Sequence, residues 1–126
     1  MISSAEAKMH LRIDGNDEDA WLNVWIPAVT GAVLSWLKDP WRAYVQAVDS
    51  DGAPIVDSNG DPVPAVDSSG DPVVLPLVKA AALLELAQQY RFRDGKDAGA
   101  MPAGAGYTLG MGATSLLNGL RRSTLA

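Results

Sequence analysis

The chain has 126 residues, 48% of them hydrophobic, and a formal net charge of −5, which together predict one globular domain over residues 1–126 with a modest core. The absence of cysteine excludes disulfides, Cys-ligated zinc and thiol nucleophiles. A pI of about 4.6 argues against a dedicated nucleic-acid binder, which usually has a basic face.

The first helix is expected at residues 4–12. Ser3-Ser4-Ala5-Glu6 fits a capping box, in which the Glu6 side chain accepts a hydrogen bond from the backbone N–H of the capping residue. The alternating apolar residues of this segment would also fit a strand. The residues Ala, Glu, Lys and Met favour a helix.

The second helix is expected at residues 17–38, with Asn16 or Asp17 as its cap and Asp39-Pro40 as its end. Its inner stripe consists of Leu22, Trp25, Ile26, Val29, Val33 and Leu37. Further apolar residues extend this surface beyond what a lone surface helix needs. We therefore expect a subunit interface here, with the candidates Trp21, Val24, Trp25 and Trp36.

One short sequence then occurs three times, beginning at Val48, Val56 and Val66, and it reads Val-Asp-Ser-x-Gly followed by Asp or Ala and Pro. Asp and Ser bond back to nearby backbone N–H groups and Gly accepts a positive φ, so each copy predicts a tight turn. The flanking Val and Ile residues favour short strands. We expect residues 45–75 to form a β-hairpin or meander insertion.

This insertion holds the acidity of the chain. Residues 45–75 contain six aspartates and no Lys or Arg. Because the whole chain has a charge of −5, the remaining residues carry about +1. Unpaired buried carboxylates are costly, so we expect an acidic surface formed by Asp49, Asp51, Asp57, Asp61, Asp67 and Asp71.

The third helix is expected at residues 76–93, with Pro76 at its first position, and the last at residues 114–122. The Gly- and Ala-rich residues 95–113 between them predict a loop. The fold class is therefore mainly α, a small helical bundle with the β insertion between its second and third helices. No signal peptide is expected, and no membrane span, because no apolar run reaches ~18 residues.

No combination of residues predicts catalysis, a cofactor or a metal site. The sole histidine, His10, is expected to be solvated, and Asp17-Glu18-Asp19 fits helix-start charge. The repeated turns resemble calcium loops only partly, because they lack a third ligand before the glycine and a bidentate Glu near position twelve. The chain is therefore not expected to be an enzyme.

The order of several motifs resembles the head–tail connector (adaptor) proteins of tailed bacteriophages. The resemblance begins with Glu6-Ala7-Lys8-x-x-Leu11-Arg12-Ile13-Asp14 and continues through Asp17, Asp19, Leu22, Ile26 and Ala28. It resumes at Pro76-Leu77-Val78-Lys79-Ala80-Ala81-x-Leu83-Leu84, Tyr90-Arg91-x-Arg93, Leu116-Leu117 and Arg121. In the family a short link stands where this chain has residues 45–75, and a proline with an aromatic often stands where this chain has Gly119-Leu120.

The resemblance implies a structural virion protein, assembled in the bacterial cytoplasm and located at the head–tail junction. Such proteins form a homo-oligomeric ring, bind the portal protein and the tail-side connector (stopper) or tail proteins, and leave a channel through which DNA passes without specific binding. Candidates for portal contact are Leu116, Leu117, Leu120, Arg121 and Arg122. The alternative is a small acidic regulatory or DNA-mimic protein that binds a host partner. A third possibility is a calcium-dependent binding module.

Overall fold

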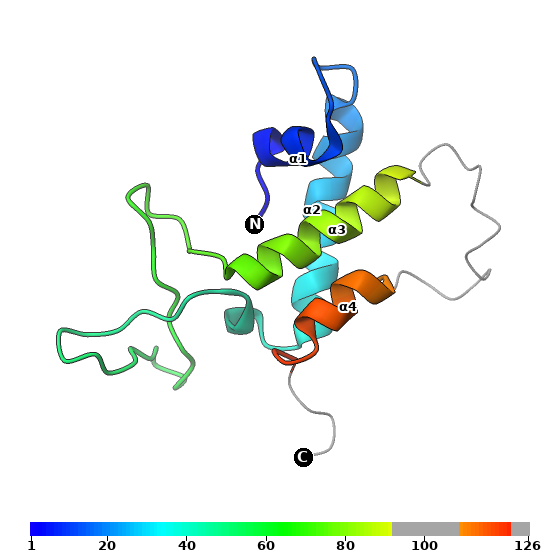
Figure 1. Ribbon diagram of the computed structural model, residues 1–126. Coiled ribbons are helices and arrows are strands. Elements are labelled where there is room, and N and C mark those ends of the chain that lie inside the picture. Colours follow the sequence, from blue (N-terminus) through cyan, green and yellow to red (C-terminus); the bar gives the residue numbers. More distant parts are fainter. Residues whose placement is uncertain (92–108, 122–126) are drawn as a thin grey trace.

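The computed structural model describes residues 1–91 and 109–121. These residues form the helices α1 (Ser4–Leu11), α2 (Asp19–Leu37), α3 (Pro76–Arg91) and α4 (Met111–Leu117), and a short 3₁₀ helix η1 (Pro40–Ala43) follows α2 (Figure 1). The prediction of a mainly helical fold is confirmed. The expected helix end at residues 92–93 and the loop residues 95–108 lie outside the described residues.

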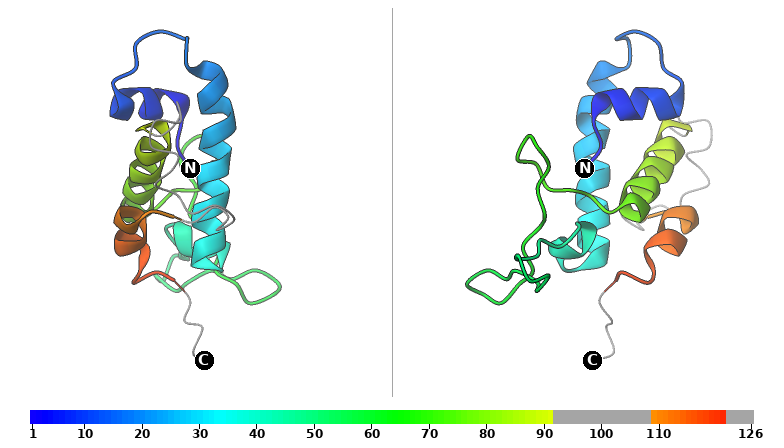
Figure 2. Two further views of the ribbon diagram at one scale, coloured as in Figure 1. Left: turned by 90° about the vertical axis from the view of Figure 1, so that its right-hand side faces the viewer. Right: turned by 60° about the vertical axis from the view of Figure 1, so that its left-hand side comes forward.

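The helices form two sides of a small bundle, with α2 on one side and α1, α3 and α4 on the other (Figure 2). α3 is central because it packs against α1, α2 and α4. Small residues such as Ala81 and Ala82 let the neighbouring helices approach α3 closely. The core consists of Ile2, Ala7, Leu22, Val29, Val33, Leu37, Ala43, Val78, Ala81, Ala82, Leu86, Ala113 and Leu117.

Both ends of α1 are capped. The Ser3 hydroxyl accepts from the Glu6 backbone N–H and Glu6 Oε1 accepts from the Ser3 N–H, each at 3.0 Å, which confirms the capping box. At the other end Arg12 adopts φ 58°, and its N–H donates to the Lys8 carbonyl. A left-handed residue at this position is ordinarily glycine.

The expected cap of the second helix is wrong. α2 begins at Asp19 after Glu18, and no side chain caps it. Asn16 instead accepts from Lys8 Nζ at 3.1 Å, and the same ammonium pairs with Asp19 Oδ1 at 2.8 Å. Lys8 thereby joins α1 to the start of α2, and the side chain of Asn16 is used in this contact.

The last helix begins and ends earlier than residues 114–122. Gly110 is its N-cap, and its N–H donates to the buried carboxylate of Glu85 at 2.8 Å, so α4 starts where the chain is attached to α3. Thr114 lies inside the first turn and donates back to the Gly110 carbonyl at 3.1 Å. The helix ends at Leu117, just before Asn118 and Gly119.

The predicted β-hairpin or meander over residues 45–75 is not confirmed, because this segment forms no sheet. It contains five isolated antiparallel bridges, Tyr44–Val74, Gln46–Pro64, Val48–Pro54, Val56–Pro62 and Val66–Pro72. Four of them include a proline, which has no N–H to extend a ladder of hydrogen bonds. We call residues 45–75 the acidic insertion.

Backbone hydrogen bonds in the acidic insertion close in threes. Val45 N–H donates to Val73, Val73 to Ala65, and Ala65 back to Val45, at 2.8–2.9 Å. A second ring of 2.8–3.0 Å bonds joins Ala47, Val63 and Ile55 in the same way. Four passes of the chain, separated by the three turns, therefore form two triangles with three members each, an arrangement that a flat sheet cannot have.

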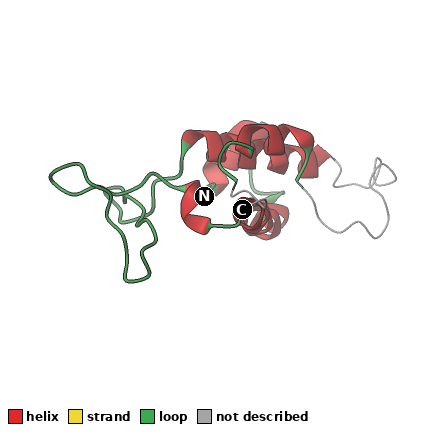
Figure 3. Cartoon of the chain, turned by 90° about the horizontal axis from the view of Figure 1, so that it is seen from below, coloured by secondary structure: helices red, strands yellow, loops and turns green. Residues whose placement is uncertain are grey.

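The acidic insertion stands away from the helices (Figure 3). Its base is attached where the Leu75 N–H donates to the Ala43 carbonyl at 2.9 Å, between η1 and α3. The insertion therefore forms a projection on one side of the helical bundle.

Candidate interaction surfaces

An aromatic cluster joins the start of α2 to the end of α3. The rings of Trp21 and Trp25 stack with centroids 5.9 Å apart, and Tyr90 meets Trp21 edge-on at 5.2 Å. Both tryptophans are half-buried. These two predicted interface residues therefore have partners within the chain and still present part of their rings to the surface.

Trp36 is covered by the C-terminal part of the chain. The Arg121 guanidinium lies 4.8 Å from the centroid of its ring, and Arg121 Nε donates to the Trp36 carbonyl at 3.0 Å. A guanidinium over an indole is a favourable cation–π pair. The predicted interface residue Trp36 and the predicted portal-contact residue Arg121 thus contact each other.

The outer face of α2 has no charge. Residues 20–37 include no Asp, Glu, Lys or Arg. Val24 is 65% exposed, and the residues that share its face are exposed as well, namely Ala20, Pro27, Ala28, Gly31 and Ser35. Exposed helix faces normally carry polar and charged residues, so this face is typical of one that another surface covers.

α2 also corrects the expectation that no segment has the length of a membrane span. It has 19 residues with a mean hydropathy of 1.3, which is enough by length and composition, and 22% of that stretch is buried. The expectation was based on uninterrupted apolar runs, and Asn23, Thr30 and Ser35 interrupt the run in α2. The mean hydropathy of the whole helix is nevertheless high. Core helices of soluble proteins also reach such values.

The predicted portal-contact leucines are largely used within the chain. Leu117 is fully buried, and Leu116 and Leu120 are half-buried against the core. The Leu120 carbonyl accepts from Arg42 Nη1 at 3.2 Å. Leu117 belongs to the core, so this leucine does not need an external surface to cover it. Arg122 lies outside the described residues.

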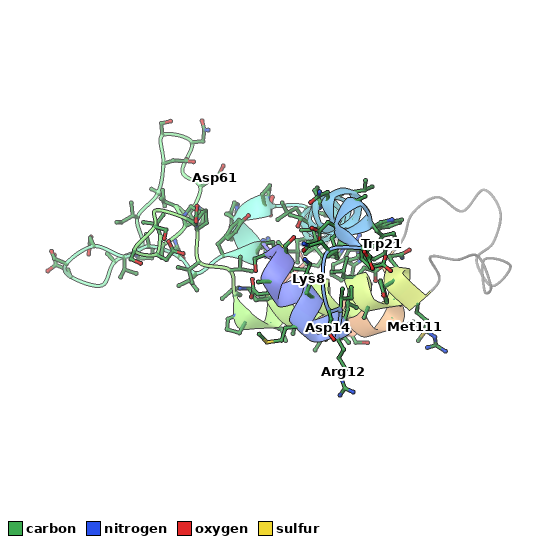
Figure 4. All side chains as sticks on the ribbon, turned by 90° about the horizontal axis from the view of Figure 1, so that it is seen from above. Lys8, Arg12, Asp14, Trp21, Asp61 and Met111 are labelled. Atoms are coloured by element: carbon green, nitrogen blue, oxygen red, sulfur yellow. The ribbon has the colours of Figure 1, made fainter. Side chains whose placement is uncertain are left out.

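The predicted chemistry of the three repeated turns is confirmed for aspartate and glycine, whereas the side chains of Ser50, Ser58 and Ser68 make none of the predicted bonds to backbone N–H groups. Oδ1 of the first aspartate of each copy (Asp49, Asp57 or Asp67) accepts from two backbone N–H groups at 2.8–3.1 Å. Each glycine has φ of 82–83°. All six aspartates of the acidic insertion are exposed. The remaining three carboxylates, those of Asp51, Asp61 and Asp71, have no part in these turn hydrogen bonds, and Asp61 is marked in Figure 4.

A second ion pair joins α1 to α3. Lys79 Nζ lies 2.7 Å from Glu6 Oε2, while Glu6 also serves the capping box. The hydrogen bond from Lys79, followed by that from the Ser3 N–H, lowers the pKa of Glu6 below its ordinary value of 4.5. Both side chains are more than a third exposed, so the contribution of this pair to stability is small.

The sequence analysis did not identify Glu85, the most buried charged residue of the described chain. Its side chain is 1% exposed, and it accepts from Gln89 Nε2 at 3.2 Å and from the Gly110 N–H at 2.8 Å. Its position could have indicated a buried carboxylate, because Glu85 is the one acidic residue in the apolar run of α3. Its partner at Gly110 is 25 residues away and could not be inferred.

Other residues give no sign of reaction chemistry. His10 is exposed on α1. Within residues 1–91 and 109–121, no three His, Cys, Asp or Glu side chains gather as a metal site would require. No protein-family model, no curated protein and no solved structure matches this chain. Functional inference therefore depends on the motifs and on the surfaces described above.

Proposed function

We propose that this chain is a non-enzymatic structural protein of a bacteriophage head–tail junction. In this proposal copies of the chain form a ring that joins the portal and capsid to the tail and leaves a channel for DNA. Its partners are the portal protein, the tail-side connector (stopper) or tail proteins, and further copies of itself. Assembly takes place in the cytoplasm of the host bacterium.

The observation that carries this proposal is that ion pairs join the motifs through which the chain resembles the connector family. Lys8 pairs with Asp19 at 2.8 Å and Glu6 with Lys79 at 2.7 Å. These four residues come from three separate motifs, on α1, α2 and α3. These partly exposed pairs add little to stability, but they join α1 to α2 and α1 to α3, so residues of the three motifs contact one another. Contact between the motifs supports a shared architecture.

The uncharged outer face of α2 supports self-association. A helix of 19 residues is about 28 Å long, and an apolar face of that length is costly to leave in water. A second copy is the partner that a ring requires. The exposed Val24 lies near the aromatic cluster, so this part of α2 is the best candidate for the subunit interface.

We infer that the acidic insertion acts as a β-hairpin module of the assembled ring. Its isolated bridges gain neighbours when copies lie side by side, because short pairs of strands are marginal on their own. Its six carboxylates face the channel, its rim or a neighbouring copy. Carboxylates repel DNA phosphates and release no counterions, so DNA moves past them without being held.

One observation favours the alternative of an acidic protein that mimics DNA or regulates a host partner. All six aspartates of the insertion are exposed and have no basic partner among the described residues. A DNA mimic presents carboxylates in this manner to a basic protein. It acts as a monomer or dimer, whereas the connector acts as a larger closed oligomer.

The mass of the purified chain, alone and with a portal protein, separates these functions. A connector should give a closed oligomer of uniform size, on its own or on the portal, and a ring should be visible by electron microscopy. Monomers or dimers under both conditions would exclude the connector function. A melting temperature that rises with added calcium would instead support the calcium-dependent module.

A further inference from the structure

A groove of about 570 Å³ lies between the N-terminal segment and the third turn of the acidic insertion. Its walls come from α1, α3 and both ends of the insertion. The residues that matter for its chemistry are Ile2, Glu6, Tyr44, Asp67, Asp71 and Lys79. Apolar side chains and carboxylates therefore border the same space, which suits a long side chain with a cationic end.

The groove has an excess of negative charge. Glu6 and Lys79 pair with each other and leave Asp67 and Asp71 without a cation among the described residues. An excess of negative charge persists even when the α-amino group of Met1, which also borders the groove, is charged. The side-chain hydrogen bonds of the third turn are accepted by Oδ1 of Asp67 alone. The carboxylate of Asp71 takes no part in them, so it is available to a ligand.

The other two turns have similar chemistry and no such environment. The aspartates of the first and second turns do not border the groove. The third turn differs from them in its surroundings, because the N-terminal segment and α3 stand beside it. The second turn is therefore an internal control for any role of the third.

Arg12 is the cation within the described residues that lacks a partner. Its side chain makes no ion pair, hydrogen bond or ring contact, whereas every other described Lys or Arg makes at least one. Figure 4 shows it extending away from the helices. Arg12 also holds φ 58°, a conformation in which glycine is favoured. Residues held in sparsely populated backbone conformations are concentrated at functional sites, so the conformation of Arg12 supports a functional role.

We propose that copies of this chain associate head to tail, with Arg12 of one copy placed in the groove of the next and bound by Asp67 and Asp71. The two sites lie at opposite ends of α1, since the groove borders Ser3 and Glu6 and Arg12 follows Leu11. Contacts between two different patches form rings when the rotation closes. This inference rests on the ring proposed above and assigns it a specific contact.

Sedimentation of the full-length chain tests the contact. Arg12→Gly should weaken self-association about tenfold, as expected for loss of a charge-assisted contact. The melting temperature of the dilute monomer should stay the same or rise, because glycine relieves the positive φ. A purely structural role for Arg12 predicts a lower melting temperature instead.

Matched changes in two turns identify the other side of the contact. Asp67→Asn with Asp71→Asn should weaken association about tenfold, because asparagine preserves the turn but removes the charge. Asp57→Asn with Asp61→Asn makes the same change in the second turn and should leave association unchanged. Reversing both charges, with Arg12→Asp and Asp71→Arg in one chain, should restore association to within about threefold of the original.

The outcomes separate this contact from the ring itself. Association of Arg12→Gly at the original strength overturns the contact and leaves the ring intact. If Asp67→Asn with Asp71→Asn weakens association but Arg12→Gly does not, the proposed contact is also overturned, because a cation other than Arg12 then occupies the groove. An unaltered chain that stays monomeric, alone and with a portal protein, overturns both the contact and the ring.

Discussion

Glu6 takes part in two interactions at once, the capping box of α1 and the ion pair with α3. The capping box could be predicted because its partners are three residues apart. Lys79 could not be assigned as a partner from sequence, because 73 residues separate it from Glu6. Local hydrogen bonds are thus within reach of sequence reasoning, and contacts between distant side chains are not.

Replacing Glu6 by Gln should make stability less dependent on pH. The pKa of Glu6 is lowered in the folded chain, so its contribution is present above the ordinary value of 4.5 and is lost as the pH falls through the folded value. At pH 7 the loss should be below about 1 kcal/mol, because the pair is exposed. Thermal melts of both chains between pH 3 and 7 measure this difference.

The Lys79→Met change is the control for this prediction. In that background Glu6→Gln should have a smaller effect at pH 7, because the largest cause of the lowered pKa has been removed. Equal effects of Glu6→Gln in both backgrounds would contradict a stabilising pair.

Replacing Glu85 by Ala should release α4 from α3. The change leaves the half-buried Gly110 N–H without its acceptor and creates a void at the buried Glu85, at a cost of about 2–4 kcal/mol. Glu85→Gln keeps a carbonyl acceptor and should cost less. Urea unfolding followed by tryptophan fluorescence gives both values. Asp14→Ala, a change at an exposed carboxylate, should stay within about 0.5 kcal/mol of the original.

The helices show which parts of the fold can be inferred locally. α1, α2 and α3 lie close to their expected positions because the capping box of α1, the apolar spacing and Pro76 of α3 are all encoded nearby. α4 was misplaced because its start depends on the distant carboxylate of Glu85. The insertion was predicted as turns and strands, and its turns are confirmed, while its strands are reduced to single bridges by prolines and by pairing in threes.

Replacing residues 49–73 by a short Gly-Ser link should leave the helices folded. The insertion is attached mainly at its base, and no core residue comes from its arms. The far-ultraviolet circular dichroism and a cooperative melt should therefore persist, while ring closure or tail joining weakens. Loss of the cooperative melt would show that the insertion is part of the core.

The arrangement of the whole chain depends on which faces are covered. The inner stripe of α2 could be predicted, since Leu22, Val29, Val33 and Leu37 are buried, and so could the surplus of apolar residues outside it. Sequence could not show that Arg121 covers Trp36 or that Leu117 joins the core formed by the other helices, because both arrangements bring together segments far apart in the chain. Of the predicted interface residues, Val24 is the most exposed.

Val24→Asp should prevent ring formation without unfolding the monomer. The side chain is 65% exposed, so the charge costs little in the free chain, but it would be buried between copies if this face is the interface. Association measured by native mass spectrometry should fall at least about tenfold. Met111→Asp changes another exposed apolar residue, 87% exposed at the start of α4, and is the control. Equal association of both variants would exclude the outer face of α2.

The two closed triangles of hydrogen bonds have a consequence for cooperativity. In each ring, the residue whose carbonyl accepts one hydrogen bond donates the next bond through its N–H. Opening one bond therefore weakens the other two bonds of the same ring. The arms should then form and melt together, with their amide protons exchanging with solvent at one common rate. Deleting the second repeat would remove Val63 and Ala65 and break both rings, whereas deleting the first or the third would remove Ile55 or Val73 and break one ring. Two rings need four passes of the chain, and three turns are the number that joins four passes, so closure of both rings accounts for three repeats.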